Sequence, residues 1–231
     1  MSELFLSRLQ LDPRRREVQR ALADCHMLHQ QILTGFATAK TPNAREEFGI
    51  LYRLEIEQKT GVPALMVQST TTPDWARSDG PGLLAAGETA EIKEISAAHE
   101  AIAPGMRLRF RLRANPTRRV NRSHAGTDPM AGKRVDVRDE KGQRDWLDRQ
   151  AERCGFSVVG VQVQPGDVLG GKQRGRRGKG DDARRLTFTT VIFDGVLEVA
   201  NVEVFRAALR QGIGSAKAYG FGLLSVAPAR E

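Results

Sequence analysis

The sequence has little cysteine, few aromatic residues and no long apolar run. Its two cysteines, Cys25 and Cys154, are too few for a disulfide framework, and we interpret them as small buried side chains. No stretch approaches the roughly 18 apolar residues that a membrane span needs, and residues 1–16 lack the apolar core of a secretory signal. These absences exclude a disulfide scaffold, predict no membrane association and favour a cytoplasmic protein.

Basic residues are the main excess in the composition. The 231 residues, 40% of them hydrophobic, suffice to bury a core, and 36 Lys and Arg against 28 Asp and Glu give a net charge of +8. Residues 107–134 hold nine basic side chains and one acidic one, and residues 172–185 hold seven and two. The remainder of the chain is therefore net negative. Basic charge gathered in two stretches is typical of a nucleic-acid-binding surface.

Hydrophobic periodicity in the first half predicts a strand over 3–11, a helix over 14–34 and strands over 49–57, 64–71 and 89–95. The apolar residues of the helix recur at three- and four-residue spacing, so one of its faces is suited to pack on a sheet. The second half repeats this order of elements. Its predicted elements are a strand over 106–114, a helix over 139–154, strands over 156–164 and 186–194, a helix over 202–211 and a strand over 221–227.

Both halves therefore fit a split β-α-β unit. We predict an α+β fold of two tandem ferredoxin-like domains, each with the RRM-like order β-α-β-β-α-β. The predicted domains are residues 1–96 and 106–231, joined by a linker over 97–105. Sheets of this kind often bind RNA.

Residues 107–113 alternate strictly between arginine and apolar residues, and lysine is absent. In a strand the four arginines share one face and the apolar residues share the other. One interpretation is a solvated strand face. However, four like charges in a row repel one another unless an anion shares them, and guanidinium groups suit phosphate. We predict RNA contact for this face and for the basic residues that follow it. The candidates are Arg107, Arg109, Arg111, Arg113, Arg118, Arg119, Lys133 and Arg134.

Residues 170–185 are rich in glycine, arginine and lysine and have no apolar period, which predicts a loop between two strands. One interpretation is a solvated, disordered insertion. The other is a basic finger that becomes ordered on an RNA stem. In the second case the RNA-binding candidates are Lys172, Arg174, Arg176, Arg177 and Lys179.

His26 and His29 lie three residues apart on the first predicted helix and so share a face. A metal site would need a third ligand, which the pattern does not supply. His29 also falls in register with the buried face, so a structural role is open. The functional alternative is general acid and base catalysis, because histidine titrates near neutral pH. RNA carries its own nucleophile, the ribose 2′-OH, so such chemistry needs no metal.

Residues 212–222 contain four glycines between a predicted helix and a predicted strand, the reverse of a Rossmann or P-loop context. A plain helix-to-strand turn would explain them. Alternatively, Gly212 and Gly214 permit close approach of a phosphate to the backbone, with Lys217 as the cation. No nucleotide cofactor is expected, since the spacing matches neither fingerprint.

Taken in order, these pieces resemble the CasE family, the precursor-RNA endoribonuclease subunit of type I-E CRISPR systems. The resemblance runs nearly end to end. It is carried by His26-Met-Leu-His29, by Arg109-Phe-Arg-Leu-Arg-Ala-Asn-Pro116, by Gly132-Lys-Arg-Val135 and by the long stretch over 211–228. It implies tandem ferredoxin-like domains, metal-independent cleavage on the 3′ side of a repeat hairpin with a 2′,3′-cyclic phosphate product, and retention as a subunit of the Cascade complex.

By position, His29 matches the catalytic histidine of the family and Lys217 the lysine of its glycine-rich loop. The insertion over 172–185 falls where relatives carry the element that engages the major groove of the stem. His26 stands where the family members compared have tyrosine, so an imidazole would replace a phenol there.

The sequence thus favours an endoribonuclease that grips a CRISPR repeat RNA hairpin and cleaves it with His29, aided by His26 and Lys217, without a metal or other cofactor. Other Cascade subunits are the implied protein partners. One alternative is a hairpin-binding subunit without catalytic activity, in which the histidines are structural. Another is a small-molecule phosphate enzyme that uses the glycine-rich loop.

Overall fold

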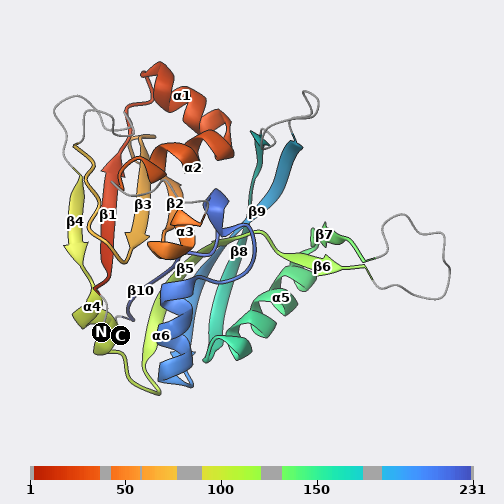
Figure 1. Ribbon diagram of the computed structural model, residues 1–231. Helices are drawn as coiled ribbons and strands as arrows, with labels where there is room; N and C mark the ends of the chain where they lie inside the picture. The colour runs from red at the N-terminus through yellow and green to blue at the C-terminus, as the bar shows by residue number, and fades with distance from the viewer. Residues whose placement is uncertain are drawn as a thin grey trace.

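The computed structural model describes residues 3–36, 43–57, 59–76, 90–120, 132–173 and 184–229. Two four-stranded antiparallel sheets and a two-stranded hairpin make up its β-structure (Figure 1). The two sheets come from the two halves of the chain. No helix in these ranges is both long and apolar enough to cross a membrane.

The N-terminal sheet has the strand order β2-β3-β1-β4. Its strands are β1 (Phe5–Gln10), β2 (Leu51–Ile56), β3 (Pro63–Ser69) and β4 (Glu91–Glu94). The first and third strands occupy the centre, which is the ferredoxin-like order. All four strands were predicted from their apolar alternation.

The helix predicted over 14–34 is two helices, α1 (Arg16–Ala23) and α2 (Cys25–Leu33), so the prediction of one helix is wrong. The break is at Asp24, whose backbone is extended, with φ −137° and ψ 108°. The Asp24 carboxylate accepts hydrogen bonds from the N–H groups of His26 and Met27, so it caps the second helix. The apolar period runs through the break because both helices pack on the same core, through Val18 of α1 and Leu28 and Ile32 of α2 among others.

The C-terminal sheet has the order β10-β5-β9-β8, which is again ferredoxin-like. Its strands are β5 (Arg107–Ala114), β8 (Phe156–Gln173), β9 (Arg184–Val199) and β10 (Leu224–Pro228). Two helices, α5 (Glu140–Arg153) and α6 (Val202–Gln211), contribute Trp146, Leu147, Phe205 and Leu209 to the core of this half. The prediction of tandem ferredoxin-like folds is confirmed.

The β8–β9 hairpin is longer than predicted. Residues 170–173 pair with residues 184–187, so this part of the predicted loop is strand. Lys172 stands opposite Arg185 in the register. Figure 1 shows the hairpin rising past the C-terminal sheet to the height of α1 and α2. Arg174, Arg176, Arg177 and Lys179 lie outside the described residues.

A second, short hairpin projects from the C-terminal half (Figure 1) and consists of β6 (Thr117–Arg119) and β7 (Arg134–Asp136). β7 begins inside the stretch over 132–135 that carries part of the family resemblance. Asn115, at the foot of this hairpin, donates to Asp136 and to the carbonyl of Thr189, which fixes the hairpin to β9.

Buried polar side chains join the two halves. Arg53 of β2 donates to the carbonyls of Arg111 and Leu223 and to the hydroxyl of Ser225. Gln68 of β3 donates to the carbonyl of Leu209 in α6. There are also two short α-helices, α3 (Ala44–Glu47) and α4 (Ser96–Glu100), and α4 begins one residue before the predicted linker. The boundaries 1–96, 97–105 and 106–231 stay a prediction.

Candidate active site and RNA-binding surfaces

Asp24 connects the helix of the histidines to the long basic hairpin. One carboxylate oxygen caps α2, and the other accepts a hydrogen bond of 3.1 Å from the backbone N–H of Lys172 in β8. Gly171 permits this contact, because a Cβ at that position would lie 2.7 Å from the sulfur of Cys25 and 2.9 Å from an oxygen of Asp24. The base of the hairpin is therefore held against the start of α2.

Two histidines and a tyrosine form the centre of the candidate site. His26 and His29 lie one turn apart on α2, and the ring of Tyr219, in the 3-10 helix η1 (Lys217–Tyr219), lies against both. Its centroid is 6.5 Å from that of His26 and 6.2 Å from that of His29. The two imidazoles thus share a helix face, as their spacing predicts.

His29 is positioned by ring contacts. Its ring stacks on Tyr52 of β2, with centroids 6.5 Å apart and planes 15° apart. Within the described residues, its buried Nδ1 has no hydrogen-bond partner, and neither does the Nδ1 of His26. Burial, followed by the charges of His26 and Arg45, lowers the pKa of His29 to about 4. At neutral pH the His29 imidazole is uncharged and able to accept a proton.

Hydrogen bonds within and around the glycine-rich loop after α6 hold η1 next to this site. The N–H of Ile213 donates to the carbonyl of Gly222, and the N–H of Gly222 donates to the carbonyl of Arg113. The Tyr52 hydroxyl donates to the carbonyl of Ala218 at 2.9 Å, which ties η1 to β2. Gly222 has φ +88° and lies close to the Ile213 backbone, so both its conformation and its surroundings favour glycine.

Lys217 lines two cavities. One, of about 430 Å³, is also lined by Arg45, Thr70 and Gln211 among others. The other, of about 550 Å³, is lined by the glycine-rich loop, α5 and the β6–β7 hairpin. Burial and the charge of Arg45 lower the pKa of Lys217, so an anion in either cavity would favour its charged form.

The larger cavity brings together several predicted RNA-binding residues. Arg118, Arg119 and Arg134 line it from the hairpin, and Gly212, Gly214 and Lys217 line it from the loop. It also contains two arginines of α5, Arg149 and Arg153, that the sequence pattern did not single out. Lys133, beside Arg134, is exposed and does not line it.

Two of the four arginines on one face of β5 form ion pairs with carboxylates of β9. Arg111 forms a bidentate ion pair with Asp194 of β9, at 2.7 and 3.0 Å, and Arg107 pairs with Glu198 at 3.0 Å. The anions that share the charges of Arg107 and Arg111 are therefore carboxylates of the neighbouring strand, so repulsion among the arginines does not by itself indicate an outside anion at these two positions. RNA contact by these two residues stays a prediction without that support.

The other two arginines of β5 are in different surroundings. Arg113 is half-buried, with its guanidinium 5.3 Å from the centroid of Phe221, and burial lowers its pKa. It underlies the glycine-rich loop, where Gly220 approaches it. Arg109 is exposed and has no ion pair within the described part of the chain. Arg109 is therefore the member of this face that is best placed for an outside anion.

Three residues of the site were missed at the level of sequence. Tyr219 and Tyr52 contact His29. Arg45, in the four-residue helix α3, carries a charge that helps to lower the pKa of both His29 and Lys217. The Arg45 side chain is 19% exposed and pairs with Glu46. No local pattern marks these residues, since each reaches the site through the tertiary fold. Within the described residues, no three His, Cys, Asp or Glu side chains are grouped as metal ligands would be.

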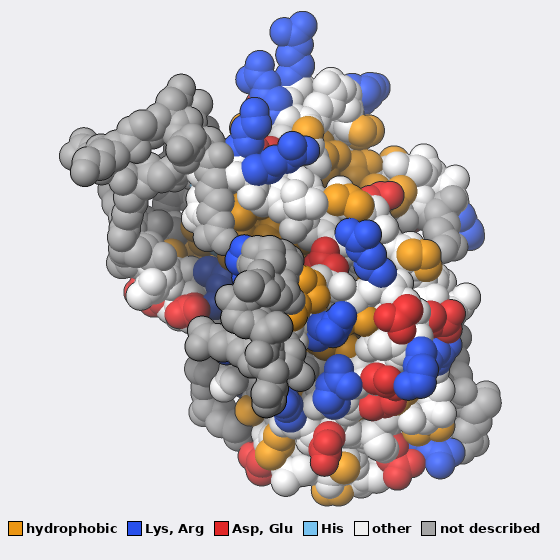
Figure 2. Space-filling view, turned by 90° about the vertical axis from the view of Figure 1, so that its right-hand side faces the viewer, with side chains coloured by type: hydrophobic (Ala, Val, Ile, Leu, Met, Phe, Trp, Pro, Cys, Tyr) orange, Lys and Arg blue, Asp and Glu red, His pale blue; other side chains and the backbone are white. Residues whose placement is uncertain are grey.

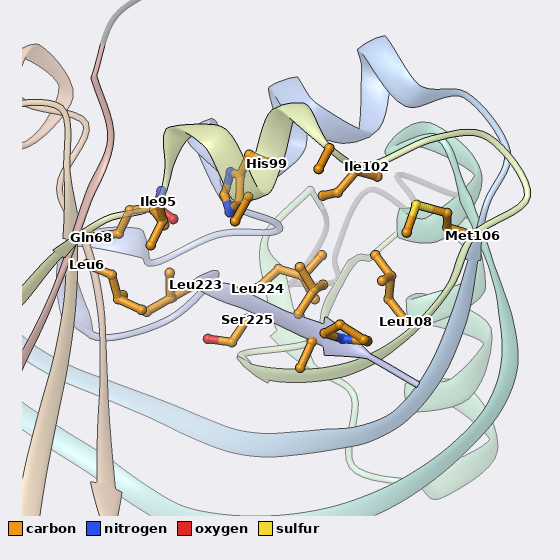
Figure 3. A pocket seen from close by; sticks show the side chains of 15 residues that line it. Leu6, Gln68, Ile95, His99, Ile102, Met106, Leu108, Leu223, Leu224 and Ser225 are labelled. Atoms are coloured by element: carbon orange, nitrogen blue, oxygen red, sulfur yellow. The ribbon is translucent and has the colours of Figure 1, made fainter. Parts of the chain in front are cut away.

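The charged surfaces and the apolar ones are separate. Figure 2 shows Lys and Arg side chains gathered at the end of the molecule where Figure 1 places α1. An apolar hollow of about 370 Å³ lies instead between α4 and β10, where His99 points toward Leu224 (Figure 3). Ile102, Met106 and Leu108 also line it. Apolar side chains make few favourable contacts with a phosphate backbone. We therefore place the candidate RNA site at α2 and η1 and not at this hollow.

The chain matches the profile of the family described as "CRISPR associated protein" over residues 4–228. It is 35% identical over 232 residues to the CRISPR-associated endoribonuclease Cse3 of Thermus thermophilus, a match that covers 97% of this chain and 100% of that protein. It is also 33% identical over 127 residues to the CRISPR system Cascade subunit CasE of Escherichia coli, which covers 54% of this chain and 59% of CasE.

Solved structures agree with the fold. A structure of the CRISPR endoribonuclease Cse3 bound to a 19-nucleotide RNA has a TM-score of 0.76 and 34% identity, covering 98% of this chain and 100% of that one. A structure of Thermus thermophilus Cse3 bound to an RNA that represents a pre-cleavage complex has a TM-score of 0.74 and 33% identity, with the same coverage. The chain therefore belongs to the family of CRISPR-associated proteins that includes Cse3 and CasE.

Proposed function

We propose that this protein is a CRISPR endoribonuclease that binds the hairpin of its repeat RNA, cleaves the precursor RNA by attack of a ribose 2′-OH, and stays on the product as a subunit of Cascade. One observation carries the proposal. A histidine that is uncharged at neutral pH and a second histidine lie against Tyr219, and Lys217, in the same 3-10 helix as Tyr219, lines a cavity rich in arginine. This is the set of groups that metal-independent RNA cleavage requires.

His29 is the general base in this mechanism. Because its pKa is about 4, its imidazole accepts the proton of the 2′-OH at neutral pH. The 2′-oxygen then forms a bond to phosphorus while the bond from phosphorus to the 5′-oxygen breaks. His26 is the group assigned to donate a proton to the departing 5′-oxygen, and Lys217 stabilises the charge on the phosphate. The products are a 2′,3′-cyclic phosphate and a 5′-hydroxyl.

The relatives support the substrate and the partners. Thermus thermophilus Cse3 is named an endoribonuclease and has been solved with RNA in a pre-cleavage complex. The Escherichia coli relative is named a Cascade subunit. We extend both properties to this chain, together with a cytoplasmic location, because the match to Cse3 spans nearly its whole length.

The direct test is incubation of the protein with the CRISPR repeat RNA of its own genome, with and without EDTA. We expect discrete products, cut 3′ of the hairpin, that end in a cyclic phosphate and form equally well with chelator. A shift in gel mobility without cutting would identify a binding subunit instead. Loss of cutting in EDTA would contradict the metal-independent mechanism but leave RNA binding intact.

The pH profile tests the assignment of His29 as the base. We expect kcat/KM not to fall between neutral pH and about pH 5, and to fall about tenfold per pH unit below about pH 4, because the lowered pKa keeps the His29 imidazole unprotonated above that point. An ordinary histidine would lose activity below about pH 6.5.

The variant Arg45→Gln serves as the matched comparison in this measurement. It removes a positive charge that helps to lower the pKa of His29, so the acid limb should move to higher pH. The same lowered pKa makes the folded state less stable as pH falls from about 6.5 through 4, since protons bind the unfolded chain more tightly. Circular dichroism at each pH therefore has to show folded protein. An acid limb near pH 6.5 in the parent protein would contradict the assignment.

A further inference from the structure

The cavity of about 550 Å³ beside Lys217 has walls from three parts of the C-terminal half. The β6–β7 hairpin forms one wall, the glycine-rich loop a second, and α5 a third. Its cations are Arg118, Arg119, Arg134, Arg149, Arg153 and Lys217. No Asp or Glu is among the described residues that line it. Its volume is within the range of ligand-binding pockets.

Helix α5 presents Arg149 and Arg153 on one face. They are four residues apart, both are exposed, and they share the cavity with Trp146 and Gln150 of the same helix. Elsewhere on α5 the basic residues are paired along the helix, Lys141 with Asp145 and Arg144 with Glu140. Arg149 and Arg153 have no such partner within the described part of the chain.

The arginines of the cavity also differ from those of β5. Arg107 and Arg111 are neutralised by carboxylates of β9, whereas the five arginines of the cavity form no ion pair with any described residue. The acid closest to them in the hairpin, Asp136, instead accepts hydrogen bonds from Asn115 and Thr189. Unshared like charges around one hollow repel one another, and a polyanion relieves this repulsion.

The position of Lys217 relates the cavity to the cut. Lys217 lines this cavity and also the cavity of about 430 Å³ that Arg45 lines. An RNA backbone with one phosphate at Lys217 therefore has the basic side chains of the cavity next to its neighbouring phosphates. Guanidinium groups line two walls of the cavity, and a guanidinium group can bind a phosphate bidentately.

We propose that the RNA backbone next to the scissile phosphate runs through this cavity, between α5 and the β6–β7 hairpin, and that Arg149 and Arg153 bind its phosphates. This inference rests on the proposed endoribonuclease function. In this proposal α5 forms one wall of the path and fixes the direction in which the RNA leaves the cut. The phosphates belong either to the base of the stem or to the single strand that flanks it.

The test compares two double variants that lose the same charge. Arg149→Gln with Arg153→Gln removes the α5 wall, whereas Arg138→Gln with Lys141→Gln removes two exposed basic residues just before and on the same helix but outside the cavity. The probe is the repeat hairpin with a 2′-deoxy nucleotide at the cut, which binds but cannot react. It is used with both flanks and with the flank beyond the cut removed, and affinity is measured over a series of salt concentrations.

We expect the first double variant to bind the full probe at least about tenfold more weakly and to lower the slope of log K against log salt by roughly 1.5, since about two phosphate contacts are lost. The control should keep the parent slope. A defect that persists without the flank assigns the phosphates to the stem, and one that vanishes assigns them to the flank. Parent affinity and slope on both probes would overturn the inference, while failure of the parent protein to bind or cut would instead overturn the proposed function.

Discussion

Replacing His29 with alanine is expected to lower single-turnover cleavage of the repeat RNA about 10²- to 10⁴-fold, the usual contribution of a general base. The affinity for the hairpin should stay close to that of the parent protein. His29 is half-buried between Tyr52 and Tyr219, away from the exposed arginines that are proposed to bind phosphate. The rate is measured with excess protein, so that slow product release does not mask the chemical step.

His99 offers a matched control for this variant. Burial also lowers its pKa to about 4, and its Nδ1 likewise has no partner within the described residues, but it lies in the apolar hollow between α4 and β10. His99→Ala therefore removes a histidine of the same electrostatic kind from outside the site. Its cleavage rate should equal that of the parent. Equal rates for His29→Ala and the parent would contradict the assignment of the base.

Much of the fold could be predicted because the local signals agree with it. Helix α6 spans Val202–Gln211, the same residues that the apolar spacing predicts, and the strict alternation over 107–113 gives the two faces of β5. The errors occur where a tertiary contact decides. Asp24 breaks a helix whose apolar period continues without interruption, because its carboxylate is used both as a cap and as an acceptor for β8.

The candidate site could be predicted only in part, for the same reason. His26, His29 and Lys217 stand in recognisable patterns, and the structure places both histidines against Tyr219, which shares the helix η1 with Lys217. The carboxylate that neutralises Arg111 is 83 residues away in the sequence, and it becomes a neighbour only through the register of β5 with β9. Counting charges along the sequence therefore overestimated the unpaired positive charge of β5. It also overlooked Arg149 and Arg153, which lie on an ordinary amphipathic helix.

The double use of Asp24 leads to the second large effect. Asp24→Ala should lower the free energy of unfolding by about 1 kcal/mol through loss of the helix cap. It should also lower cleavage about 10²-fold, since a small displacement of catalytic groups has effects of that size. The carboxylate fixes the start of α2, and hence His26, relative to the base of the β8–β9 hairpin. Chemical denaturation and single-turnover cleavage are measured on the same preparations.

Two further variants separate the cap from the connection to the hairpin. Asp139→Ala removes the equivalent cap from α5, where the carboxylate accepts from the N–H of Gly142, and should lower stability by a similar amount with little effect on cleavage. Asp24→Asn keeps an oxygen for the cap but replaces the other with an amide nitrogen, which cannot accept from Lys172. Its stability should be near that of the parent while its cleavage is reduced. If Asp24→Asn cuts at the parent rate, the cap alone positions the histidines and the contact to the hairpin has no part in catalysis.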